Sequence, residues 1–276
     1  DFILKYAFEQ NWLSPTIRVG LGLFGATVLA VLGYYARRGA YWLLSEGLTG
    51  AGIGVYYLSF YATYGFYDLL PMIPAFACMA SVTAGALILS LHYDSRATAF
   101  LGLLGGLLTP VLLSTGEPST IELYSYLLVL DAGALAISVR RSWFELGALS
   151  FVGTVILFGG WSWRFYRPGL LHLVASFMVL FYALFAGAAE LYRRRGARLS
   201  RRFSHVLIFG NAIVWFGALC LLRPGQEHAI FLALLLVLTV GSTLGSWFLK
   251  SPLIGWSALM LAPLPFWVWM GRSRGQ

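Results

Sequence analysis

The chain has 276 residues, of which 59% are hydrophobic and 11% charged, and its mean hydropathy is +0.77. A soluble globular protein has about 25% charged residues, so this composition excludes a water-soluble fold and indicates an integral membrane protein. The net charge is +8, but the arginines gather at the ends of apolar segments, which favours orientation signals over nucleic-acid binding.

Apolar segments long enough to cross a bilayer as helices, roughly 20 residues each, follow one another with short loops between them. The sequence therefore predicts an all-α fold, a polytopic transmembrane helix bundle. Residues 1–8 are expected to be the end of a truncated N-terminal helix, so that the chain is a fragment of a longer protein. About ten complete spans are predicted after it, at 15–36, 41–67, 72–93, 97–115, 121–139, 143–163, 168–192, 203–222, 228–249 and 252–270.

These spans are predicted to form a single transmembrane domain, 1–276. A weak four-helix repeat relates segments 15–115 and 121–222, because an Arg-Arg pair followed by tryptophan, glutamate and glycines recurs in both. An even number of spans per repeat gives a parallel repeat.

The basic residues predict the orientation. If the spans alternate in direction, about 12 basic residues lie on one side of the membrane and 7 on the other. The positive-inside rule places the richer side in the cytoplasm. That side includes the loop between Arg193 and Arg202, which is expected to contact anionic lipid headgroups.

A break is predicted in the apolar segment 101–116, LGLLGGLLTPVLLSTG. Gly105 and Gly106 are adjacent, and Thr109 and Pro110 follow one helical turn later. Proline removes a backbone donor and its ring crowds the preceding turn, so we expect the helix to kink or unwind. Irregular backbone in a membrane must be buried in protein or line a watery cavity. The four residues are therefore predicted to form one wall of an outward-facing cavity.

Asp131 lies near the middle of its predicted span, in LLVLDAGALAI. An ionisable side chain at that depth is costly and commonly marks a functional site. One interpretation is a carboxylate that binds a proton or a cation. The other is a structural carboxyl group, neutral or hydrogen-bonded, that caps the backbone of the broken neighbouring helix. No basic residue lies at matching depth, which disfavours an ion pair.

Three more charged residues are candidate intramembrane functional residues. Glu46 and Glu145 lie in the first turns of spans that leave the predicted cytoplasmic side. The helix macrodipole stabilises carboxylates there, and the alternative is that both line one vestibule facing the cytoplasm. Arg18 lies one turn inside the outer end of its span, where it either pairs with Glu122 or extends to the interface.

The remaining polar residues of the spans favour packing. Tyr57, Tyr61 and Tyr64 recur at i, i+4 and i+7 and so share one helix face. Contact with neighbouring helices is the first interpretation of this stripe, and a cavity for an amphipathic substrate is the second. Asn211 is expected to make an interhelical hydrogen bond. We find no catalytic triad, metal-ligand spacing or nucleotide-binding glycine loop, so no catalytic residue, metal, cofactor or nucleic-acid partner is predicted.

The first half of the chain resembles a bacterial family of large predicted membrane proteins, domain of unknown function 2339. The resemblance rests on four stretches: FILKYAFEQNWLSPTIRVGLG at 2–22, EGLTGAGIGVYYLSFYATYGFYDLLP at 46–71, LHYDSRATAFLGLLGGLLTPVLLSTG at 91–116 and LDAGALAISVRRSWFELG at 130–147. It implies a multi-pass protein of the bacterial inner membrane. It carries no established activity, substrate or site residue.

Three functions are weighed from these features. The leading hypothesis is transport or permeation of a small solute, because a broken helix beside a mid-membrane carboxylate is typical of transporter binding sites. The second is a membrane scaffold or assembly partner of envelope complexes. The third is a membrane enzyme acting on lipid-linked substrates, which lacks a well-placed acid–base pair.

Overall fold

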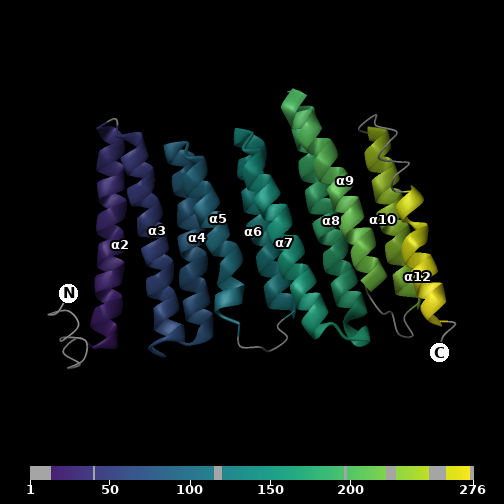
Figure 1. Ribbon diagram of the computed structural model, residues 1–276, viewed down its shortest axis with the longest axis horizontal. Coiled ribbons are helices and arrows are strands. Elements are labelled where there is room, and N and C mark those ends of the chain that lie inside the picture. Colours follow the sequence, from purple (N-terminus) through teal and green to yellow (C-terminus); the bar gives the residue numbers. More distant parts are fainter. Residues whose placement is uncertain are drawn as a thin grey trace. The chain divides into compact units, whose positions relative to one another are not determined.

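The computed structural model describes residues 14–39, 41–114, 120–195, 198–221, 228–248 and 259–273. Those residues are helical and contain no strand (Figure 1). The α-helices are α2 (Pro15–Arg38), α3 (Trp42–Gly65), α4 (Met72–Tyr93), α5 (Arg96–Leu112), α6 (Thr120–Arg141), α7 (Phe144–Phe165), α8 (Leu171–Arg194), α9 (Arg198–Leu221), α10 (His228–Phe248) and α12 (Pro263–Ser273). A short 3-10 helix, η1 (Pro168–Leu170), precedes α8. The all-α prediction is confirmed for the described residues, and the predicted N-terminal helix at 1–8 lies outside them.

Local sequence explains where these helices start and end. The Ser14 side chain accepts a hydrogen bond from the Ile17 amide at 3.4 Å, and Pro15 takes the first helical position, where it loses no intrahelical bond. Between α4 and α5, Asp94 adopts a left-handed conformation with φ 50°, and the Ser95 side chain caps the Thr98 amide at 3.2 Å. Two residues therefore suffice to end one helix and begin the next.

Six helices of the described part are long and apolar enough to cross a membrane. They are α2, α4, α6, α7, α8 and the segment Arg201–Leu219 of α9. At most 44% of the most apolar window of each is buried inside the protein, so much of their apolar surface faces outward, as lipid-facing helices require. Helix α3 has 24 residues, but its glycines, tyrosines and hydroxyl side chains keep it less apolar. Helix α5 and the apolar segments Phe231–Trp247 and Leu259–Val268 are shorter.

The helices divide into two compact units, residues 1–117 and 118–276. In the first unit α2 contacts α3, α4 contacts α5, and α3 contacts both members of that second pair. Figure 1 shows α2 to α5 as neighbouring antiparallel helices joined by short connections. In the second unit α6 contacts α7, α8 contacts α9, and α10 and α12 pack on the α8–α9 pair. The boundary falls between the segments of the predicted repeat, and the repeat and the single domain stay predictions.

The predicted unwinding in segment 101–116 is wrong where the structure describes it, and the alternative, a kink, stays a prediction. Gly105, Gly106, Thr109 and Pro110 all lie within the continuous helix α5, and Pro110 stands in its last turn. The Thr109 hydroxyl donates to the Gly105 carbonyl at 2.9 Å, a bond back to the backbone of the same helix. Proline near a helix end removes only one interior hydrogen bond, so the helix ends at Leu112 instead of opening in its middle.

Candidate functional site

Asp131 is the most buried of the four charged candidate residues, with an exposed fraction of 0%. It lies on α6 and faces α7, which follows after a turn in which Ser142 has φ 58°. Ser150 donates to one carboxylate oxygen, Oδ1, and Thr154 donates to the other, Oδ2, each at 2.5 Å. Both donors are also fully buried. Each carboxyl oxygen of Asp131 therefore has a hydroxyl donor inside the protein.

This arrangement favours one form of the structural interpretation of Asp131. The carboxyl group is hydrogen-bonded, as that interpretation requires, and its bonds join α6 to α7. Capping of the α5 backbone stays a prediction, because α5 belongs to the other unit. Among the described residues its hydrogen bonds come from Ser150 and Thr154 alone. Two hydroxyls and a carboxylate also form an oxygen-rich cluster that can hold a proton between them, so the proton-binding interpretation stays a prediction.

Two more buried polar clusters tie the second unit together. Ser138 of α6 donates to the Trp143 carbonyl at 2.5 Å, accepts from the Gly147 amide at 3.1 Å and shares a hydrogen bond with the Tyr192 hydroxyl of α8. These bonds fix the α6–α7 turn against α8. All four residues are buried, and a buried polar group without a hydrogen bond is costly.

Asn211 of α9 holds the second cluster. Its amide donates to the Tyr182 carbonyl of α8 at 3.1 Å and accepts from Trp215 Nε1 at 2.6 Å. The Tyr182 hydroxyl shares a 2.8 Å hydrogen bond with Ser242 of α10. The predicted interhelical hydrogen bond of Asn211 is confirmed.

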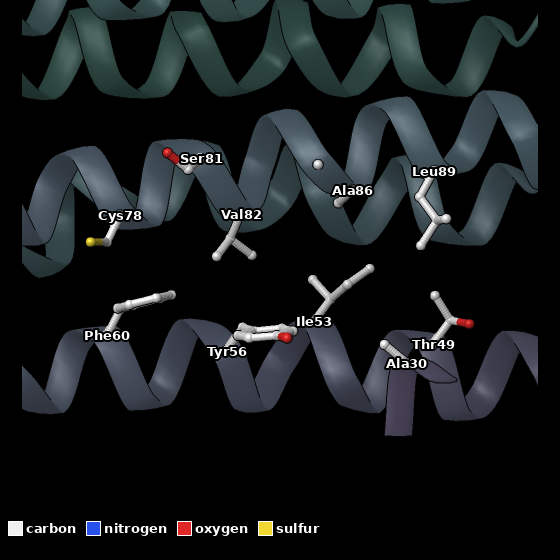
Figure 2. Close-up of a pocket in the computed structure, with 11 residues that line it drawn as sticks. Ala30, Thr49, Ile53, Tyr56, Phe60, Cys78, Ser81, Val82, Ala86 and Leu89 are labelled. Carbon is white, nitrogen blue, oxygen red and sulfur yellow. The ribbon is translucent and has the colours of Figure 1, made fainter. Parts of the chain in front are cut away.

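A cavity of about 450 Å³ lies in the first unit, between α3 and α4 with one residue of α2 (Figure 2). Its walls are mainly apolar, with hydroxyls at Thr49, Tyr56 and Ser81. The lining residues are Ala30, Thr49, Ile53, Tyr56, Phe60, Cys78, Ser81, Val82, Gly85, Ala86 and Leu89. A volume of this size lies in the usual range for small-molecule sites, about 300–1,000 Å³.

The tyrosine stripe does not line this cavity. Tyr57 is 9% exposed, shares a 2.6 Å hydrogen bond with Thr83 of α4 and donates to the Gly102 carbonyl of α5 at 3.2 Å. Gly105 leaves room for its ring, since a Cβ there would collide with ring atoms. Tyr61 and Tyr64 pack against the same core. The first interpretation, packing, is confirmed for the stripe, and the cavity uses the neighbouring face at Tyr56.

The remaining candidate residues lie in separate places. Glu46 is half-buried in the first turns of α3, and Glu145 is exposed in the first turn of α7. They belong to different units, so their shared vestibule stays a prediction. Arg18, half-buried on α2, belongs to a different unit from Glu122, and that pairing also stays a prediction. Among the described residues no three His, Cys, Asp or Glu side chains gather as metal ligands would.

Arginines gather at one end of each unit. Arg37, at the end of α2, donates through Nη2 to the Tyr93 carbonyl at the end of α4, and its guanidinium carbon lies 5.1 Å from the centre of the Tyr93 ring. In the second unit Arg195 donates to the Arg140 carbonyl at 2.5 Å. Glu190 binds Arg193 and Arg194 at 2.6 and 2.9 Å, which offsets part of that positive charge. These contacts place the end of α2 beside the end of α4, and the end of α6 beside the end of α8.

A family model described as "Predicted membrane protein (DUF2339)" matches residues 1–275. The chain belongs to this family. No curated protein and no solved structure matches it.

Membership in DUF2339 confirms the resemblance seen in the four stretches of the first half and extends it over nearly the whole chain. Together with the apolar helices, it makes this DUF2339 chain a membrane protein. The family description assigns no reaction or ligand, so the chemistry must come from the two places described above. Sequence reasoning singled out Asp131 but not its partners Ser150 and Thr154, and it missed the cavity between α3 and α4. The sequence signal that could have indicated the cavity is the series of small side chains at Cys78, Ser81 and Gly85, which lie along one face of α4.

Proposed function

We propose that this protein has a transport or permeation role for a small amphipathic solute. The observation that carries the proposal is the cavity of about 450 Å³ among apolar helices of the first unit. Its apolar walls suit the hydrophobic part of a solute, and the hydroxyls of Tyr56 and Ser81 offer weak polar contacts. A fully hydrated ion would lose its hydration there without replacement.

Asp131 is proposed as the proton-binding group of this role. An ionisable side chain in a membrane-spanning segment is kept at a cost in stability, and Ser150 and Thr154 hold both of its oxygens at 2.5 Å. Loss of the proton would leave an uncompensated negative charge between α6 and α7, which would destabilise the contact between these two helices. Transport that depends on pH is the expected consequence.

For the membrane arrangement we propose about ten spans in the inner membrane of a bacterium, with the arginine-rich ends in the cytoplasm. The contacts from Arg37 to Tyr93 and from Arg195 to Arg140 support it, because they join ends that the alternating topology places on one side. The positive-inside rule then fixes that side. The shorter helices α5, α10 and α12 count as spans in this proposal.

The test uses the purified protein in liposomes and three small amphipathic dyes, one anionic, one cationic and one neutral. Entry of at least one dye should be faster than in protein-free liposomes. Gly85→Phe should remove that acceleration, because a Cβ at Gly85 meets nothing within 4 Å and a larger side chain would fill the cavity. Gly54→Phe is the matched control, since Gly54 is exposed on α3, has the same open surroundings and does not line the cavity.

Asp131→Asn should keep the overall shape and remove the dependence of dye entry on pH. If none of the three dyes enters faster than in protein-free liposomes, the transport role is refuted. If Gly54→Phe lowers entry as much as Gly85→Phe, the cavity is not the route.

A further inference from the structure

The cavity of the first unit is a long slot. On α3 its lining residues Thr49, Ile53, Tyr56 and Phe60 follow the spacing i, i+4, i+7 and i+11. On α4 the lining runs from Cys78 to Leu89, which are also eleven positions apart. At about 1.5 Å per residue, the slot is roughly 16 Å long and parallel to the helices, and Figure 2 shows the two rows of side chains facing each other.

That length matches one lipid acyl chain. The hydrocarbon core of a bilayer is about 30 Å thick, so the chains of one leaflet fill about 15 Å. The slot also opens sideways, because Ser81 and Gly85 on its α4 wall are exposed. A chain could therefore enter from the surrounding lipid without passing through the protein.

One end of the slot leads to a positively charged group. Leu89, the last lining residue of α4, is one turn before Tyr93, and Ala30, the lining residue of α2, is two turns before Arg37. Arg37 donates through Nη2 to the Tyr93 carbonyl, while its Nη1 is buried and has no hydrogen-bond partner among the described residues. A buried guanidinium N–H without a partner is costly, and a phosphate oxygen would satisfy it.

The charge at this end fits an anionic headgroup. Three arginines lie at this end of the unit: Arg37 and Arg38 at the end of α2, and Arg96 at the start of α5. The same end carries two carboxylates, Glu46 and Asp94, so its net charge is positive. Arg38 is exposed and lies over the Tyr34 ring, 4.7 Å from its centre. No residue that lines the slot is itself charged, and between Phe60 and Cys78 at its other end the sequence has one charged residue, Asp68.

We propose that this slot binds one acyl chain of an anionic phospholipid, with the lipid phosphate at Arg37. The proposal rests on the proposed function in that it names the class of amphipathic molecule that the same cavity takes. The proposed site requires no ligand other than a phospholipid of the surrounding membrane. The slot binds the acyl chain, and Arg37 determines the preference for negatively charged headgroups.

The test labels the full chain in bilayer nanodiscs with phosphatidylglycerol or phosphatidylcholine that carries a photoreactive diazirine in one acyl chain. Peptides that contain residues 49–60 and 78–89 should be labelled, more by phosphatidylglycerol than by phosphatidylcholine. Gly85→Phe should lower that labelling about tenfold, equivalent to about 1.4 kcal/mol, and Gly54→Phe should leave it unchanged. Ser81→Phe is a second slot-filling variant with the same expected loss, should Gly85→Phe fail to fold.

The headgroup is tested separately. One arginine near an anionic surface contributes about 1 kcal/mol, so Arg37→Gln should reduce the preference for phosphatidylglycerol about fivefold. Arg37→Lys should restore much of it, and Arg38→Gln should leave it nearly intact. Equal labelling by the two lipids in the native protein, equal loss in Arg38→Gln and Arg37→Gln, or full labelling in both slot-filling variants would each overturn the proposal. Labelling as expected with no dye entry refutes only transport, whereas dye entry without slot labelling refutes only the lipid site.

Discussion

The hydrogen bond from Thr154 to Asp131 gives a sharp test of how the second unit is held together. Thr154→Val keeps the shape of the side chain and leaves Asp131 Oδ2 without its donor. Hydrogen bonds to charged groups contribute about 1.5–3 kcal/mol in soluble proteins, while interhelical bonds in membranes average about 0.6 and reach about 1.7 kcal/mol. Because both partners are fully buried and the bond is 2.5 Å long, we expect a loss of about 1–2 kcal/mol.

The free energy of unfolding is measured in mixed micelles by titration with a denaturing detergent. Ser150→Ala should cost a similar amount, and the double variant should cost more than the sum, because the carboxyl group then keeps neither donor. Thr239→Val is the control, since the Thr239 hydroxyl bonds only to the Leu235 carbonyl of its own helix at 2.7 Å. If Thr154→Val and the control lose the same stability, the Asp131 cluster does not hold α6 to α7.

Three other predictions concern the first unit. Gly105→Leu should destabilise it by about 1–3 kcal/mol through overpacking against a tyrosine ring, measured by thermal melting, whereas Gly20→Leu, with open space around its Cβ, should have little effect. Pro110→Ala should leave the melting temperature unchanged or raise it, because α5 is already helical through this position; a large decrease would contradict the continuous helix. Reporter fusions ending at Gly39 and Asp68 should give cytoplasmic fluorescence for the first and external phosphatase activity for the second, and the reverse pattern would refute the proposed orientation.

Helix positions could be predicted from the sequence because apolar length and capping residues act locally. Ser14 and Pro15 mark the start of α2, and the Asp94–Ser95 pair separates α4 from α5. The depth of Asp131 was also predictable from its distance to the α6–α7 turn. Its partners were within reach of the same reasoning, since Ser150 and Thr154 lie four residues apart after that turn and return to a similar depth.

The continuity of α5 and the presence of the cavity could not be predicted, because both depend on residues distant in the chain. Gly105 and Gly106 look like helix breakers by themselves. In the structure Gly105 instead makes room for the ring of Tyr57, 48 residues earlier in the sequence. A stripe of tyrosines marks a helix face, but only the neighbouring helices decide whether that face packs or lines a cavity, and here the adjacent face at Tyr56 borders the slot.

In the proposed topology, α2 to α5 have a consequence for how the number of spans can change. If each of these helices crosses the membrane, four crossings return the chain to the side of the membrane from which α2 starts. A block of this kind can be gained, lost or duplicated in a gene without inverting any helix that comes later.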